Sequence, residues 1–203
     1  MRYSKYVIHF VTLFFAIPSI SFAQDYSAQA KVTILLGSKG QTYTVDRVVD
    51  GDTFQLSNGQ NLKLASINAP ELHDVTKLPK EAKRFGKEIW AYRTIGGKAH
   101  EAMEHFLRLG KYQIQLESGT ETFDENGNLV AYVYVPLGQL EEGILPDGVI
   151  FLEQGDRHGV FLNAYLVKMG FAEVVGAQNE KYHGLLSKLQ DEAKANKKGI
   201  WES

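Results

Sequence analysis

The chain contains no cysteine among its 203 residues. Disulfide frameworks and thiolate metal sites are therefore excluded. After residue 23, no apolar run is long enough to cross a bilayer as a helix. Lysine and arginine are absent from residues 112–156, which instead hold nine acidic side chains. This segment would repel a phosphate-rich ligand at distances up to a Debye length, about 8–10 Å.

The N-terminal residues have the layout of a secretory signal peptide. Arg2 and Lys5 give a basic start, and residues 7–20 are an apolar run too short to span a hydrocarbon core of roughly 30 Å. Small residues then lead to a cleavage position after Ala23. We expect residues 1–23 to be removed and the mature protein to be secreted or periplasmic, without a membrane span. A later cut, or retention as a membrane anchor, are the alternatives.

The rest of the chain predicts a mixed α+β fold. Residues 24–40 are expected to form a lead-in with a first strand, followed by a single domain over 41–203. Strands are expected at 31–36, 41–49, 53–57, 61–67, 112–117 and 129–135, and helices at 77–94, 96–110, 163–169 and 179–197. Asn58-Gly59 between two alternating runs predicts a hairpin. Residues 136–159 are rich in glycine and proline, and we interpret them as a surface insertion.

The chain contains five distinctive stretches in this order: VVDGDTFQL, INAPEL, DENGNLVAYVYV, FLNAYLVKMGFAEV and a terminal GIW. Together they resemble the staphylococcal nuclease (thermonuclease) family, with longer segments than usual near 72–96 and 136–158. The DGDT element followed by a Pro-Glu pair is the most specific part. The resemblance implies a five-stranded OB-fold β-barrel with about three outer helices. It also implies Ca²⁺-dependent hydrolysis of DNA or RNA, and we expect a monomer.

Phosphodiester hydrolysis places extra negative charge on the phosphate in the transition state. The chemistry therefore needs a hard cation held by oxygen ligands, guanidinium groups on the phosphate oxygens, and a carboxylate that positions water. The resemblance assigns Asp52, Asn68 and the Ala69 carbonyl to the metal ion. It assigns Glu71 to the attacking water.

Three positions depart from the family pattern. Asn68 stands where a second metal-binding aspartate is usual, so we expect Ca²⁺ to be weakly held. Lys63 and Asn128 stand where two phosphate-gripping arginines are usual: Lys63 keeps the charge without the fork, and Asn128 has neither. Residues 174–178 lack the tyrosines of the family's nucleotide site. The sequence therefore predicts a nuclease of reduced activity.

Each of these residues also has a purely structural interpretation. Asp50 and Asp52 flank a glycine and can simply shape a turn. Lys63 can be a solvated strand residue, and Asn128 follows a glycine in a polar hairpin. If Asn128 is structural, Arg84 or Arg93 in the long 72–96 segment is a candidate to replace the missing phosphate ligand.

A second function remains open from the sequence. A catalytically silent OB-fold module could bind nucleic acid through residues 72–111, which hold nine bases against five acids. It could instead bind a protein through the acidic segment 112–156. The replaced arginine at Asn128 favours this alternative, whereas Asp52 and Glu71 favour the enzyme.

Overall fold

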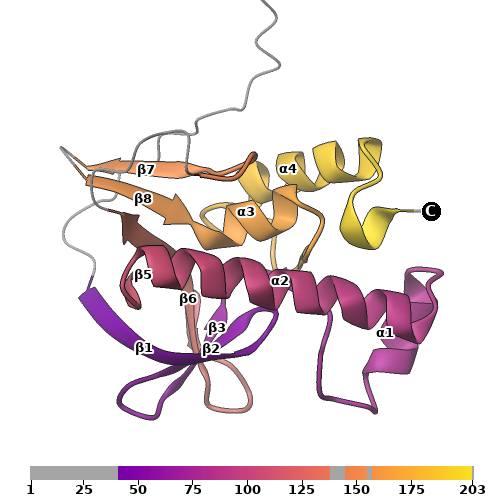
Figure 1. The fold of residues 1–203 in the computed structure, drawn as a ribbon, viewed down its shortest axis with the longest axis horizontal. Helices are drawn as coiled ribbons and strands as arrows, with labels where there is room; N and C mark the ends of the chain where they lie inside the picture. Colours follow the sequence, from indigo (N-terminus) through magenta and orange to yellow (C-terminus); the bar gives the residue numbers. More distant parts are fainter. Residues whose placement is uncertain (1–40, 138–144, 155–156, 203) are drawn as a thin grey trace, which may run out of the picture.

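The computed structural model describes residues 41–137, 145–154 and 157–202 (Figure 1). The predicted signal peptide (1–23) and the lead-in with its first strand (24–40) lie outside these residues. No helix in the part of the chain that is described is both long and apolar enough to span a bilayer.

The sheet closes into a five-stranded barrel. Its strands are β1 (Gln41–Asp50), β2 (Thr53–Leu56), β3 (Asn61–Leu64), β5 (Gln113–Phe123) and β6 (Leu129–Leu137). Neighbours follow the order β3-β2-β1-β5-β6, and a parallel pairing of β3 with β6 joins the two ends. In β2 and β3 every second residue is buried, as expected for strands with one face on a core. The predicted OB-type barrel is therefore confirmed.

Two short strands and a hairpin lie beyond the barrel. β4 (Ile67–Asn68) pairs with β9 (Glu173–Val174). β7 (Phe151–Gln154) and β8 (Arg157–Phe161) extend the sheet because β8 pairs with β6. The segment interpreted as a surface insertion (136–159) therefore contains strand structure continuous with the barrel, apart from 138–144 and 155–156, which lie outside the description.

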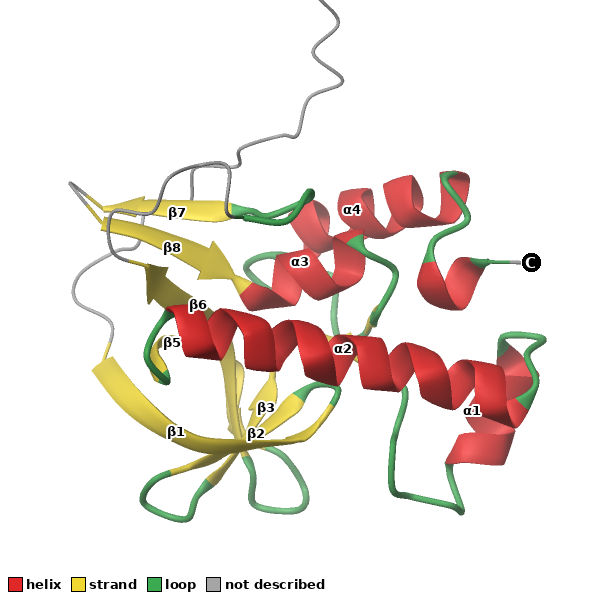
Figure 2. Cartoon of the chain, viewed as in Figure 1, coloured by secondary structure: helices red, strands yellow, loops and turns green. Residues whose placement is uncertain are grey.

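The described residues form four α-helices, α1 (Leu78–Arg84), α2 (Ile89–Leu109), α3 (Leu162–Lys168) and α4 (His183–Ala195), followed by a 3₁₀ helix η2 (Gly199–Trp201). Figure 2 shows α2 lying across the barrel strands, with α1 against its N-terminal end. The predicted helices at 77–94 and 96–110 had the wrong boundary. Gly86, with φ of +65°, separates α1 from α2, whereas Gly96 lies inside α2.

The longer segment after residue 71 forms α1, which packs on α2 through its own apolar cluster. Leu78 and Ala82 are buried against Tyr92 and Ile95. The ring of Phe85 stacks on that of Tyr92 at 5.4 Å. This packing holds α1 beside the loops that carry the candidate site.

Candidate functional site

Asp52 is the buried acid of the site. It follows β1 in the turn to β2 and is only 5% exposed. Thr53 Oγ1 donates to Asp52 Oδ1 at 2.9 Å, and the Ala69 N–H donates to Oδ2 at 3.1 Å. Burial raises the pKa of Asp52, while the Lys63 ammonium, 3.6 Å from Oδ2, opposes that rise. The carboxylate is therefore held rigidly, with only part of its charge compensated.

The lack of a side chain at Gly51 lets the loop that carries Asp50 and Asp52 lie against the loop that carries Ala69 and Glu71. A Cβ atom at Gly51 would lie 2.8 Å from Ala69 Cβ and 3.3 Å from Ala99 Cβ. The backbone between Asp50 and Asp52 can therefore approach both residue 69 and α2 only because residue 51 has no side chain.

Glu71 and Asp50 form a hydrogen-bonded carboxyl pair. Asp50 Oδ1 accepts the N–H groups of Gly51 and Leu72 at 2.8 and 3.0 Å. Burial, and then the hydrogen bond with Glu71, raise the pKa of Asp50 to about 7. Burial also raises the pKa of Glu71, but its contacts with Asp50 and Lys77 outweigh this effect and lower it overall. At neutral pH Asp50 therefore holds a proton part of the time, and Glu71 stays a carboxylate.

Asn68 is engaged by an acid that the sequence interpretation missed. Its side chain hydrogen-bonds to Glu81 of α1, which also accepts the Tyr92 hydroxyl at 3.4 Å. Burial, and then the negative charge of Glu71, raise the pKa of Glu81. Asn68 itself has a neutral amide. Glu81 therefore brings a carboxyl group next to this uncharged position.

Lys63 lies in the site, whereas Asn128 is tied into a turn. Asp124 accepts the Asn128 side chain through Oδ2 at 2.9 Å and its backbone N–H through Oδ1 at 2.9 Å. The only side-chain bond of Asn128 in the described structure thus goes to the loop that carries it. Its structural interpretation is the better supported one.

Residues 61–203 match the family described as staphylococcal nuclease homologue. The chain belongs to this family. It is 27% identical over 161 residues to the SPbeta prophage-derived endonuclease YokF of Bacillus subtilis (strain 168), a match that covers 78% of this chain and 43% of that protein. It is 26% identical over 188 residues to the thermonuclease of Staphylococcus hyicus, covering 91% of this chain and 89% of the relative.

The nuclease-family relatives differ in how much of their length is matched. The endonuclease YncB of Bacillus subtilis (strain 168) is 26% identical over 161 residues, and the match covers 60% of that protein. The chain therefore spans about half the length of the two Bacillus relatives it matches.

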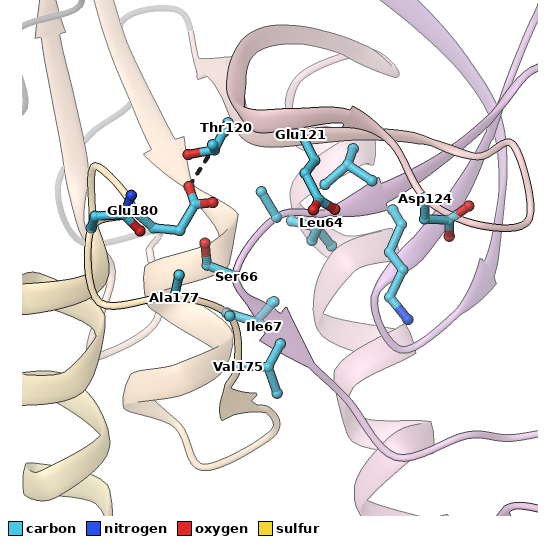
Figure 3. A pocket seen from close by; sticks show the side chains of 15 residues that line it. Leu64, Ser66, Ile67, Thr120, Glu121, Asp124, Val175, Ala177 and Glu180 are labelled. Carbon is cyan, nitrogen blue, oxygen red and sulfur yellow. Dashed lines mark hydrogen bonds between the residues drawn. The ribbon is translucent and has the colours of Figure 1, made fainter.

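A cavity of about 430 Å³ lies beside Lys63 in this nuclease-family barrel (Figure 3). Its apolar wall includes Leu64, Val175 and Ala177, and its polar wall includes three acids, Glu121, Asp124 and Glu180. Residues 174–178 lack the tyrosines of the family's nucleotide site. Three of them, Val175, Gly176 and Ala177, line the cavity with small side chains. The acids come from the lysine-free and arginine-free stretch and from the loop before α4.

The residues at the barrel rim fit a hard cation, with few charged ligands. The described residues include no group of three or more histidine or acidic side chains placed to hold a metal ion. Yet burial raises the pKa of Asp50, Asp52 and Glu81 alike, and the Lys63 ammonium offsets the rise at Asp52 only in part. Asp52 is the one charged side chain among the predicted metal ligands. A set with so few charged ligands generally binds a hard divalent cation only weakly.

The sequence interpretation missed Lys77 and Glu81 as members of the site. Both come from the segment that is longer than usual for the family, directly after Glu71. The available signal was the density of charge in that segment. Sequence spacing alone could not tell which of its charges turn back onto Glu71 and Asn68.

Gly96 is expected to control how closely α2 sits on the site. A Cβ atom there would lie 2.5 Å from the Pro70 carbonyl oxygen. Gly96→Ala should therefore shift the Pro70–Glu71 backbone and lower the free energy of unfolding by about 1–3 kcal/mol. A Cβ at the neighbouring Gly97 meets no heavy atom within 4 Å. Gly97→Ala, as the matched control, should stabilise the helix by about 0.5–1 kcal/mol. Urea unfolding measures both, and equal effects of the two changes would contradict this packing.

Proposed function

We propose that this protein is an exported, monomeric, metal-dependent nuclease that hydrolyses phosphodiester bonds in DNA or RNA at a reduced rate. The observation that carries the proposal is the cluster of Asp50, Asp52 and Glu71 with Lys63 at the rim of the barrel. Asp52 and Glu71 are 19 positions apart in the sequence, yet they lie close enough for the charge of Glu71 to contribute to the raised pKa of Asp52. The relatives named endonuclease and thermonuclease support the same reaction class.

Each residue has a role that its surroundings support. Glu71 stays ionised at neutral pH, so it can accept a hydrogen bond from the attacking water and orient it. Asp50 holds Glu71 in place through their shared hydrogen bond. Lys63, which is part-exposed beside Asp52, can donate to a phosphate oxygen. Asp52, with Asn68 and the Ala69 carbonyl, would hold Ca²⁺, which supplies charge neutralisation at the phosphate when bound.

The reduced rate follows from the cations that are missing. Lys63 donates as a point charge rather than as a planar fork. Asn128 brings no charge, and its amide is bonded to Asp124. Loss of one donor to a transition-state oxyanion commonly costs about 10²–10³ in rate.

A catalytically silent binding module is the second candidate. The bond of Asn128 to Asp124 and the acids Glu121 and Glu180 in the cavity wall favour it, because they disfavour a phosphate at the place where it would be cut. Such a module would bind nucleic acid or a protein partner without cutting it.

Cleavage assays on residues 24–203 distinguish the two functions. Single-stranded and duplex DNA and RNA are incubated with Ca²⁺ or with a chelator, beside an Asp52→Ala variant. We expect Ca²⁺-dependent cutting by the parent protein and its loss in the variant, since Asp52 is the only charged residue assigned to the metal. Binding without cutting at any Ca²⁺ concentration would reject the enzyme and favour the module.

A further inference from the structure

A nuclease site with only Lys63 facing the phosphate lacks a second positive charge. The Asn128 amide is committed to Asp124 and carries no charge. This inference rests on the proposed function. If the protein is a nuclease, another group of the chain must bind the phosphate in place of the arginine that is missing at position 128. The group must be a cation, must lie at the carboxylate cluster, and must be accessible to substrate.

Arg84 does not meet these requirements. Both terminal nitrogens of its guanidinium donate to the two carboxylate oxygens of Glu173, one of them at 2.8 Å. The same group lies over the Phe85 ring, 4.5 Å from its centroid. Its planar fork is therefore already used to fasten α1 to β9.

Lys77 meets all three requirements. Its Nζ lies 3.3 Å from Glu71 Oε1 and 3.7 Å from Asp74 Oδ2, and its side chain is 59% exposed. In the described parts of the chain, Lys63 and Lys77 are the two cations that form ion pairs with Asp52 or Glu71. Lys77 directly precedes α1, so the packing of Leu78 on α2 fixes where its backbone starts.

We propose that Lys77 donates to the phosphate oxygens of the bound nucleic acid and takes the role left by Asn128. Glu71 orients the water that attacks phosphorus, so the phosphate must lie next to the carboxylate that Lys77 already touches. An ammonium group has three donors, which lets Lys77 keep Glu71 and bind a phosphate oxygen together. The Lys77 side chain is 59% exposed, so its remaining donors are accessible to a phosphate oxygen.

The inference is tested with Lys77→Ala, Lys77→Arg and the matched control Lys80→Ala. Lys80 lies on α1, is exposed, and forms no ion pair among the described residues. We expect kcat/KM for a single-stranded oligonucleotide to fall about tenfold or more in Lys77→Ala, to be largely kept in Lys77→Arg, and to stay unchanged in Lys80→Ala.

The salt dependence of nucleic-acid binding reports contacts between cations and phosphate. It would not change if Lys77 only formed an ion pair with Glu71. The dissociation constant of the oligonucleotide is measured against salt in an Asp52→Ala background, where cutting is removed. Loss of one phosphate contact should reduce the slope of log K against log salt by about 0.7 for a single strand. We expect this reduction in Lys77→Ala and not in Lys80→Ala.

Three results would overturn the proposal. A slower Lys77→Ala enzyme with an unchanged salt slope would mean that Lys77 only positions Glu71. A faster enzyme would mean that Lys77 restrains Glu71. Equal slope changes in Lys77→Ala and Lys80→Ala would indicate a diffuse charge effect. If the parent protein does not cut at all, the proposed function fails, but the salt slope still decides whether Lys77 contacts phosphate.

Discussion

Replacing Asn128 with arginine is expected to raise kcat/KM for nucleic-acid cleavage by about 10²–10³, since one oxyanion donor is commonly worth that much. The register of the barrel supports this expectation. Lys63 of β3 is paired with Val130 of β6, and residue 128 lies two positions before Val130. The Lys63 charge also helps to lower the pKa of Asp124, the acid that binds the Asn128 side chain, so an arginine at position 128 would start in the neighbourhood of Lys63.

The matched control is Asn126→Arg, in the same hairpin. Asn126 is exposed, and its backbone N–H, like that of Asn128, is bonded to Asp124 Oδ1. This variant adds the same charge at the tip of the turn. Steady-state kinetics on one oligonucleotide with saturating Ca²⁺ compare the two. If both variants gain equally, net charge explains the effect, and if neither gains, position 128 does not face the phosphate.

Replacing Asn163 with alanine is expected to lower the free energy of unfolding by about 2–5 kcal/mol. Asn163 is fully buried at the start of α3. Its Oδ1 accepts the Val133 N–H at 3.0 Å, and its Nδ2 donates to the Ala65 carbonyl at 2.8 Å. Alanine would leave both backbone groups buried without a partner, and each such group costs about 1–3 kcal/mol.

Asn196→Ala serves as the control for that change. Asn196 Nδ2 bonds to the Glu192 carbonyl at 2.7 Å, but this contact is exposed at the end of α4. Water can replace the lost bond, so a loss of less than about 1 kcal/mol is expected. Urea denaturation followed by circular dichroism measures both variants. Comparable losses at the two sites would show that Asn163 does not bridge the barrel and α3 as the structure indicates.

Much of the fold could be predicted because its signals are local. Alternation in β2 and β3 and the Asn58-Gly59 turn are visible in short windows of sequence. The break between the first two helices was predicted at the wrong glycine because its position depends on a tertiary contact. A glycine pair suggests an end of a helix, but Gly96 is retained inside α2 because a side chain there would collide with Pro70.

The candidate site likewise has a part that could be predicted from the sequence and a part that could not. The sequence by itself determined the family and the barrel. Through the resemblance to that family, it also indicated Asp52, Glu71 and the loss of arginine at Asn128. Only the tertiary structure decided that Lys77 touches Glu71, that Asn68 is bonded to Glu81, and that Arg84 is taken by Glu173. Each of these contacts joins α1, or the residue before it, to a segment far away in the sequence or in another loop. Their formation depends on how α1 packs in the folded protein, which no local sequence pattern shows.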